Sequence, residues 1–290
     1  MSLFDQLVSE ALKNQAMLAP IRMVVEKELL HHDIIREMNA AGLLQGLTFM
    51  GGTCLRACYG SNRLSEDLDF TGGQGFRRGN LRELGDALVE RLQTKYGLHV
   101  EVGDPIRDSG NVDTWKLRMI THPEQKHMPQ QRINIDICAI PSYDRRPMVL
   151  RNHYGVDMGT QGLIIQAQSR AEILADKLVA LALRPNRLKY RDIWDIGWLK
   201  QQNVELPLEL MPKKIKDHRS DIPGYLDLLH QRLQQLQHDP GLRLDFVSEM
   251  RRFLPPRVVI ETIDKETYWH YLVDTVIAEG EAIFGRLDKK

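Results

Sequence analysis

The sequence has little of two features that would each point to a class of protein, net charge and long apolar runs. Lysine and arginine number 39 together, as do aspartate and glutamate, so the formal net charge is zero. The protein therefore has no overall positive electrostatic field that would attract nucleic acid, and any binding of nucleic acid must come from a local basic patch. No apolar stretch approaches the roughly 20 residues that span a bilayer, and residues 1–23 lack the pattern of a signal peptide.

Cysteine is also scarce, with only Cys54, Cys58 and Cys138 present. The odd count and wide spacing argue against a disulfide framework and favour a reducing compartment, the cytoplasm. Cys54 and Cys58 could share a helix face, but no second Cys or His pair lies nearby in sequence to complete a tetrahedral zinc site. We therefore predict ordinary buried thiols, because a free cysteine packs like a small apolar residue.

What is present is the patterning of an α+β protein in two parts. The 290 residues are 42% apolar and 27% charged, which is normal for a globular protein with a core. Short strand and helix patterns alternate up to about residue 168, whereas nearly every later segment has helical spacing broken by prolines. We predict a mixed sheet with flanking helices over 1–168 and an all-α domain over 169–290. Strands are expected at 47–50, 67–71, 98–102, 114–120, 132–140 and 162–167.

The chemistry-bearing stretch begins where the first predicted strand runs into Gly51-Gly52-Thr53. A Gly-Gly turn at the start of a helix frees backbone N–H groups and lets a phosphate approach closely. On the next predicted strand, Asp67 and Asp69 are two residues apart and so project to the same side. Two adjacent carboxylates repel unless a cation lies between them, and hard oxygen ligands of this kind suit Mg²⁺.

A third carboxylate, Asp136, is the candidate to complete a two-metal site, because it alternates with isoleucines on a predicted neighbouring strand. The competing interpretation is that these aspartates are only the solvated face of strands, since Asp-x-Asp is a common tripeptide. Aspartate is, however, a poor strand former. Two in one strand, after a Gly-Gly turn and with Arg63 and Ser65 at the strand entrance, favour a functional site.

The segment with Gly51-Gly52-Thr53-x-Leu55, Tyr59-Gly60 and Arg63-x-Ser65-x-Asp67-x-Asp69-Phe70 resembles the first motif of the AbiEii/AbiGii-type nucleotidyltransferase toxins. This family lies within the DNA polymerase β-like nucleotidyltransferase superfamily. A second block, Glu172-x-x-Ala175-x-Lys177-Leu178-x-Ala180 with Arg184 and Arg191-Asp192-x-x-Asp195, also matches the family. The resemblance covers roughly residues 47–200 and implies a nucleotidyltransferase-type sheet in the N-terminal domain, with the helical domain completing an active-site cleft.

The second block also has a physical interpretation. Lys177 and Arg184 are seven residues apart and share a helix face, while Asp192 and Asp195 can converge on the next helix. The alternative is an exposed helix pair with ordinary salt bridges. By resemblance, Lys177 binds triphosphate as a mobile point charge and Asp192 holds or activates a substrate hydroxyl. Asp195 is left open between the two interpretations.

The resemblance implies an enzyme that moves a nucleotide from an NTP to an acceptor hydroxyl, with Mg²⁺ (two ions) as cofactor. The implied catalytic residues are Asp67, Asp69, Asp136, Lys177 and Asp192; the implied nucleotide contacts are Gly51, Gly52, Thr53, Arg63, Ser65 and Lys177; the implied metal ligands are Asp67, Asp69 and Asp136. It further implies the toxin of a toxin–antitoxin or phage-defence pair, with tRNA as acceptor and a cognate antitoxin as partner.

Two other functions stay open from the sequence. One is a nucleotidyltransferase that modifies a protein side chain, and the other is a catalytically silent member that acts by binding a partner. The presence of every expected carboxylate argues against the silent member. Local basic segments, Lys213-Lys214-Ile215-Lys216 with Arg219 and Arg251-Arg252 with Arg257, are expected as weak support for an RNA acceptor.

Overall fold

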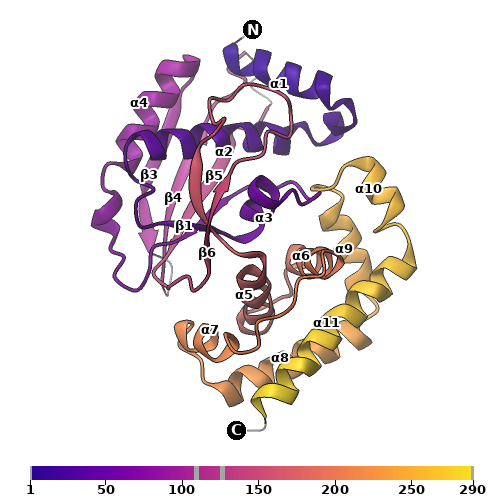
Figure 1. Cartoon of the computed structure of the whole chain (residues 1–290). Coiled ribbons are helices and arrows are strands. Elements are labelled where there is room, and N and C mark those ends of the chain that lie inside the picture. The colour runs from indigo at the N-terminus through magenta and orange to yellow at the C-terminus, as the bar shows by residue number, and fades with distance from the viewer. Residues whose placement is uncertain (1, 108–110, 125–127, 289–290) are drawn as a thin grey trace. The chain divides into compact units, whose positions relative to one another are not determined.

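The chain, seen here as a computed structural model, is described over residues 2–107, 111–124 and 128–288. It divides into two compact units, Met1–Ala167 and Gln168–Lys290. The first holds a seven-stranded mixed sheet with helices, and the second is helical (Figure 1). The α+β class predicted from the sequence is therefore confirmed.

The sheet of the first unit has the strand order β3-β4-β5-β2-β1-β7-β6. Strand β2 lies between antiparallel β1 and parallel β5, while β4 runs antiparallel to β5 and to β3. The central strands thus come from distant parts of the sequence. The strands are β1 (Thr48–Met50), β2 (Leu68–Thr71), β3 (Val100–Arg107), β4 (Val112–Met119), β5 (Gln131–Cys138), β6 (Arg145–Val149) and β7 (Ile164–Gln168).

Alternation in β5 decides which face of the sheet is apolar. Ile133, Ile135 and Ile137 are fully buried, while Arg132 on the opposite face is exposed. Helix α2 packs against β5, and α4 packs against β3. The helical segments of this unit are α1 (Leu3–Asn14), η1 (Ala16–Ile21), α2 (Arg22–Ala40), α3 (Gly51–Tyr59), η2 (Arg78–Leu81) and α4 (Leu84–Tyr96).

The strands predicted from the sequence are all present, with ends that differ by a few residues, except at β3, which extends further. The sequence did not predict β6, because Arg145–Val149 is mostly exposed and lacks the alternation of a half-buried strand. Residues 78–81 form a separate 3₁₀ turn, and α4 begins after it at Leu84. Cys54 and Cys58 are buried free thiols, as expected.

The second unit is built from α5 (Arg170–Leu183), α6 (Tyr190–Gln201), α7 (Met211–Asp217), α8 (Ile222–His238), α9 (Leu242–Met250), α10 (Pro256–Glu261) and α11 (Glu266–Leu287). Helix α11 packs on α6 and α8 (Figure 1). A Cβ on Gly197 would lie 2.1 Å from Leu272, so the glycine permits the close approach of α6 and α11. Trp194 and Trp198 are buried and belong to the core of this unit.

Ser169 caps the start of α5, since its hydroxyl accepts a hydrogen bond from the Glu172 backbone N–H at 3.1 Å. The Glu172 carboxylate pairs with Lys214 Nζ at 2.5 Å. Both side chains are fully buried, so helix packing decides the partner of this carboxylate. Among the described helices, none combines the length and apolar character needed to cross a membrane.

Candidate functional site

A row of polar side chains crosses the middle of the sheet. Asp69 of β2 is paired in register with Asp136 of β5 on one side and with Met50 of β1 on the other. Asp136 is in turn paired with Thr114 of β4, whose hydroxyl donates to Asp136 Oδ1 at 2.6 Å. Residues that are directly opposite in a sheet share a face. The structure therefore brings the Asp69 and Asp136 carboxylates to the same face of adjacent strands.

Asp67 immediately precedes β2 and has a different environment. Its Oδ1 accepts a hydrogen bond from the backbone N–H of Asn134 at 3.0 Å. Strand β2 starts at Leu68, opposite Ile135, so residues of β5 before Ile135 have no β2 partner. Asp67 accepts the hydrogen bond of one backbone amide that this leaves unpaired on β5, that of Asn134. Asp67, Asp69 and Asp136 are all of intermediate exposure. We call these three residues the acid row.

The start of α3 lies directly against the acid row. Gly51 has φ +75°, and a Cβ at this position would lie 2.7 Å from Asp69 Oδ2. Both the left-handed backbone and the space occupied by the carboxylate therefore require glycine. The Gly51-Gly52 turn predicted from the sequence is thus the N-terminus of a helix beside a carboxylate, where helix amides concentrate positive partial charge.

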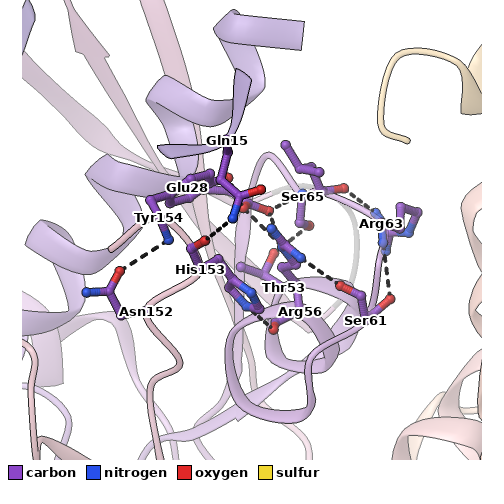
Figure 2. Close-up of polar contacts among 11 residues, drawn as sticks. Gln15, Glu28, Thr53, Arg56, Ser61, Arg63, Ser65, Asn152, His153 and Tyr154 are labelled. Carbon is purple, nitrogen blue, oxygen red and sulfur yellow. Dashed lines mark hydrogen bonds and ion pairs between the residues drawn. The ribbon is translucent and has the colours of Figure 1, made fainter. Parts of the chain in front are cut away.

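Thr53 and Ser65 lie together behind the start of α3 (Figure 2). Their hydroxyl oxygens are 2.6 Å apart, and Thr53 also donates to the backbone carbonyl of Asp67. The Ser65 backbone N–H donates to Glu28 Oε1 at 2.9 Å. Thr53 and Ser65 are only 2% and 5% exposed. The structure thus brings these two predicted nucleotide contacts together, but in the interior, where they tie α3 to the segment that enters β2.

Arg63 is likewise buried, at 2% exposure, and its guanidinium donates to the Leu64 carbonyl at 3.0 Å (Figure 2). Glu28, which holds Ser65, is a residue that sequence reasoning missed. It pairs with Arg56 Nε at 3.1 Å and accepts a hydrogen bond from the Tyr154 hydroxyl. Burial raises the pKa of Glu28, but Arg56 and Tyr154 outweigh burial and hold that pKa below its usual value. Nothing marked Glu28 in sequence, because a glutamate in a helix is ordinarily on its exposed face.

The second unit contains another cluster of charges, which we call the Lys177 cluster: Lys177, Arg184, Asp192 and Asp195. Lys177 Nζ lies 2.6 Å from Asp192 Oδ1 and 2.8 Å from Asp195 Oδ2. Arg184 Nη2 lies 3.1 Å from Asp192 Oδ2. Lys177 on α5 and Arg184, which directly follows the last residue of α5, both reach Asp192 of α6. Burial raises the pKa of Asp192, but Lys177 and Arg184 outweigh burial and hold that pKa well below its usual value.

The basic segments of the second unit differ from the expected surface patches. Lys214 is fully buried and also lies 2.8 Å from Asp176 Oδ1, so it belongs to the interior, whereas Lys213, Lys216 and Arg219 are exposed. Arg251 pairs with Asp264 at 2.6 Å, and Arg257 pairs with Glu261 at 2.7 Å. Acidic neighbours therefore offset much of the positive charge around Arg251 and Arg257.

The donor chemistry of the acid row fits a hard divalent cation, since Asp67, Asp69 and Asp136 offer carboxylate oxygens. The helix start at Gly51 leaves no side chain in front of Asp69. Within 2–107, 111–124 and 128–288, no three His, Cys, Asp or Glu side chains already stand together as a metal-binding group. The register gathers Asp69 and Asp136, while Asp67 Oδ1 is engaged with the Asn134 amide.

Comparison of this chain with known proteins identifies a matching protein family. The model of the family described as "Nucleotidyl transferase AbiEii toxin, Type IV TA system" matches residues 33–269. Two solved structures are similar in 91% of this chain at 18% identity: JHP933 from Helicobacter pylori (94% of that chain, TM-score 0.41) and a candidate nucleotidyltransferase from H. pylori (97% of that chain, TM-score 0.43). Among curated proteins no match is found. The family match spans both motifs quoted above, whereas the two structural likenesses are too weak to carry an argument.

Proposed function

Because this chain belongs to the AbiEii nucleotidyltransferase toxin family of type IV toxin–antitoxin systems, we propose that it transfers a nucleoside monophosphate from an NTP to a hydroxyl of RNA, tRNA in particular. The observation that carries the proposal is the acid row: Asp69 and Asp136 side by side on adjacent strands, with the start of α3 against Asp69. Anion-binding amides and cation-binding carboxylates at one place are what phosphoryl transfer requires.

In this proposal Asp67, Asp69 and Asp136 would hold Mg²⁺. Bound there, the ion would neutralise phosphate charge and lower the pKa of the acceptor hydroxyl. Thr114 holds Asp136 Oδ1 in place, and the Gly51 and Gly52 amides bind the triphosphate. The acceptor oxygen forms a bond to the α-phosphorus while the bond to pyrophosphate breaks, and the hydroxyl proton passes to solvent. The residues act mainly by positioning and by charge complementarity.

Thr53, Arg63 and Ser65 contribute to nucleotide binding through the backbone that they hold. Their burial supports a positioning role: the Thr53 hydroxyl holds the Asp67 carbonyl, and the Ser65 hydroxyl holds that of Thr53, while the Ser65 backbone N–H connects the segment to Glu28. Loss of either hydroxyl would loosen the start of α3 relative to β2. A misplacement of about 1 Å at such a site can lower the rate about 10²-fold.

Lys177 and Asp192 are proposed as the remaining catalytic pair, on the support of the second family motif. Lys177 would bind triphosphate oxygens and Asp192 would orient a substrate hydroxyl. Since the Lys177 ammonium already contacts two buried carboxylates, phosphate must replace one of these contacts or join them. The partners that complete the proposal are an NTP and a cognate antitoxin, which a type IV toxin family implies.

The direct test incubates the purified protein with each α-³²P-labelled NTP, MgCl₂ and bulk tRNA, with EDTA in a parallel reaction. We expect label on RNA from at least one NTP, sensitive to RNase and absent with EDTA. Label that stays on a protein band after RNase would replace the RNA acceptor with a protein acceptor. Absence of transfer to either acceptor with all four NTPs would contradict the enzymatic proposal and favour the silent, partner-binding alternative.

A further inference from the structure

A hollow of about 410 Å³ lies beside Asp67 at the open edge of β5. Lys27, Glu66, Lys116, Arg118, Arg132 and Asn134 line it together with Asp67. Its volume is near the lower end for pockets that hold small ligands, which gives room for a phosphate with its sugar. None of the functions assigned above uses the four basic residues of this hollow.

The strand pattern explains how the hollow forms. Residues 131–134 of β5 extend past the start of β2, so no β2 residue lies beside them. In β4, Lys116 and Arg118 alternate with buried residues and face the same side as Thr114. They pair in register with Asn134 and Arg132 of β5. The hollow is therefore a continuation of the sheet face that carries the acid row.

The charge balance of the hollow favours an anion. Lys27 is neutralised by Glu66 at 2.8 Å, and Arg118 lies 3.9 Å from Glu101. The side chains of Lys116 and Arg132 are exposed and make no hydrogen bond or ion pair within the described part of the chain. Arg118 and Arg132 are directly opposite each other, and like charges in this arrangement destabilise a sheet. A bound phosphate would remove that repulsion.

We propose that this hollow binds phosphate groups of the acceptor RNA strand. The proposal rests on the function proposed above and assigns a surface to its acceptor. The Gly51 amides lie on the β1 side of Asp69, whereas the basic residues lie on the β5 and β4 side. With the triphosphate bound at Gly51, the other side of the acid row is left for the acceptor. The triphosphate of the NTP is the other phosphate source, and the test separates the two.

The test compares wild type with Lys116→Gln/Arg132→Gln in the full chain. The matched control is Lys13→Gln/Arg145→Gln, which removes the same charges from exposed positions of the same unit that have no polar partner among the described residues. We measure KM for bulk tRNA, KM for the NTP, and the salt dependence of binding of a labelled single-stranded RNA. Each lost phosphate contact should reduce the slope of log K against log salt by roughly 0.7 to 0.9.

We expect the Lys116→Gln/Arg132→Gln variant to raise KM for tRNA about tenfold, to flatten the salt slope by about 1 to 2, and to leave KM for the NTP unchanged. Lys116→Arg/Arg132→Lys, which keeps both charges, should retain most of the RNA binding. A rise in KM for the NTP alone would place the triphosphate in the hollow and overturn the acceptor assignment. Kinetics and salt slope equal to those of the control would overturn the proposal while leaving the proposed function intact. A wild-type protein that labels no RNA would overturn both.

Discussion

The acid row and the Lys177 cluster are both built from aspartates in family motifs, yet the two groups of aspartates differ in burial. In the Lys177 cluster, Asp192 and Asp195 are 2% and 0% exposed and share the Lys177 ammonium. In the acid row the carboxylates are half-buried; Asp67 accepts a hydrogen bond from a backbone amide and Asp136 accepts one from a hydroxyl. The aspartates of the Lys177 cluster are thus enclosed with their cation, whereas the carboxylates of the acid row are partly open to solvent.

The difference follows from where each aspartate lies. A carboxylate buried between helices needs a cation within a few ångström, because burial alone would drive it to the neutral form. A carboxylate on a half-exposed sheet face keeps part of its hydration, so that burial penalises its charge less. Removing one member should therefore affect catalysis in the acid row, and should affect both stability and catalysis in the Lys177 cluster.

The largest effect is expected for Asp69→Asn. The substitution keeps the shape of the side chain but removes the charge that would hold Mg²⁺, so transfer should fall by roughly 10²- to 10³-fold or more while the melting temperature changes little. Single-turnover transfer from labelled NTP to tRNA measures the loss. Asp86→Asn, at an exposed position of the same unit, is the matched control and should keep wild-type activity. An Asp69→Asn variant with near wild-type turnover would remove Asp69 from the proposed site.

For Lys177→Met we expect a loss of stability as well as of activity. The change leaves two buried carboxylates without their shared ammonium, and breaking a buried ion pair in this way costs about 3–5 kcal/mol. Urea denaturation measures this difference. Lys177→Arg should recover part of the stability, but because guanidinium geometry differs it should not fully restore KM for the NTP. If the KM of Lys177→Arg for the NTP equals that of wild type, the Lys177 cluster has only a structural role, and the proposal that Lys177 binds triphosphate is wrong.

Acid should weaken the two units of the chain in different pH ranges, through His32 in the first unit and Asp192 in the second. Burial lowers the pKa of His32 to about 4, so His32 is neutral in the fold but protonates near pH 6.5 in the unfolded chain. Its contribution is complete above pH 6.5 and is lost as pH falls to about 4, by roughly 3 kcal/mol at most. For Asp192, whose pKa is lowered, the contribution is complete above about pH 4 and is lost only below it.

Stability measured by urea denaturation between pH 7 and pH 4 should therefore fall less steeply for His32→Gln than for wild type. Asp192→Asn should follow the wild-type slope over this range, apart from a constant offset, and diverge only in stronger acid. Parallel pH profiles for His32→Gln and wild type would show that His32 does not contribute to the acid response.

The smallest expected effect is on stability, in variants that distinguish the hydrogen bond of Asp67 from its repulsion by neighbouring carboxylates. Because Asp67 Oδ1 accepts the Asn134 amide, Asp67→Ala should cost about 1 kcal/mol of stability, whereas Asp67→Asn keeps an acceptor and should cost less. Repulsion between carboxylates would instead predict that Asp67→Ala is neutral or stabilising. Both variants should lose transfer activity. Thermal unfolding of the two variants shows whether the lost hydrogen bond to Asn134 or the relieved repulsion between carboxylates has the larger effect on stability. Active transfer in either variant would exclude Asp67 as a metal ligand.

Much of this arrangement follows from local sequence. The Gly51-Gly52 turn and the short strand at Leu68–Thr71 are both properties of neighbouring residues, so periodicity and glycine conformation were enough to predict them. The α+β class followed in the same way from the change of pattern near residue 168.

Only the tertiary structure decides the partners across the chain. The pairing of Asp69 with Asp136 depends on a parallel register between strands far apart in sequence, and the Asp67 contact with Asn134 depends on where β2 begins. Lys214 looks like a surface lysine in a basic run, yet helix packing buries it against Glu172. Burial and long-range pairing depend on which elements become neighbours, and that information is spread over the whole chain rather than held in any one segment.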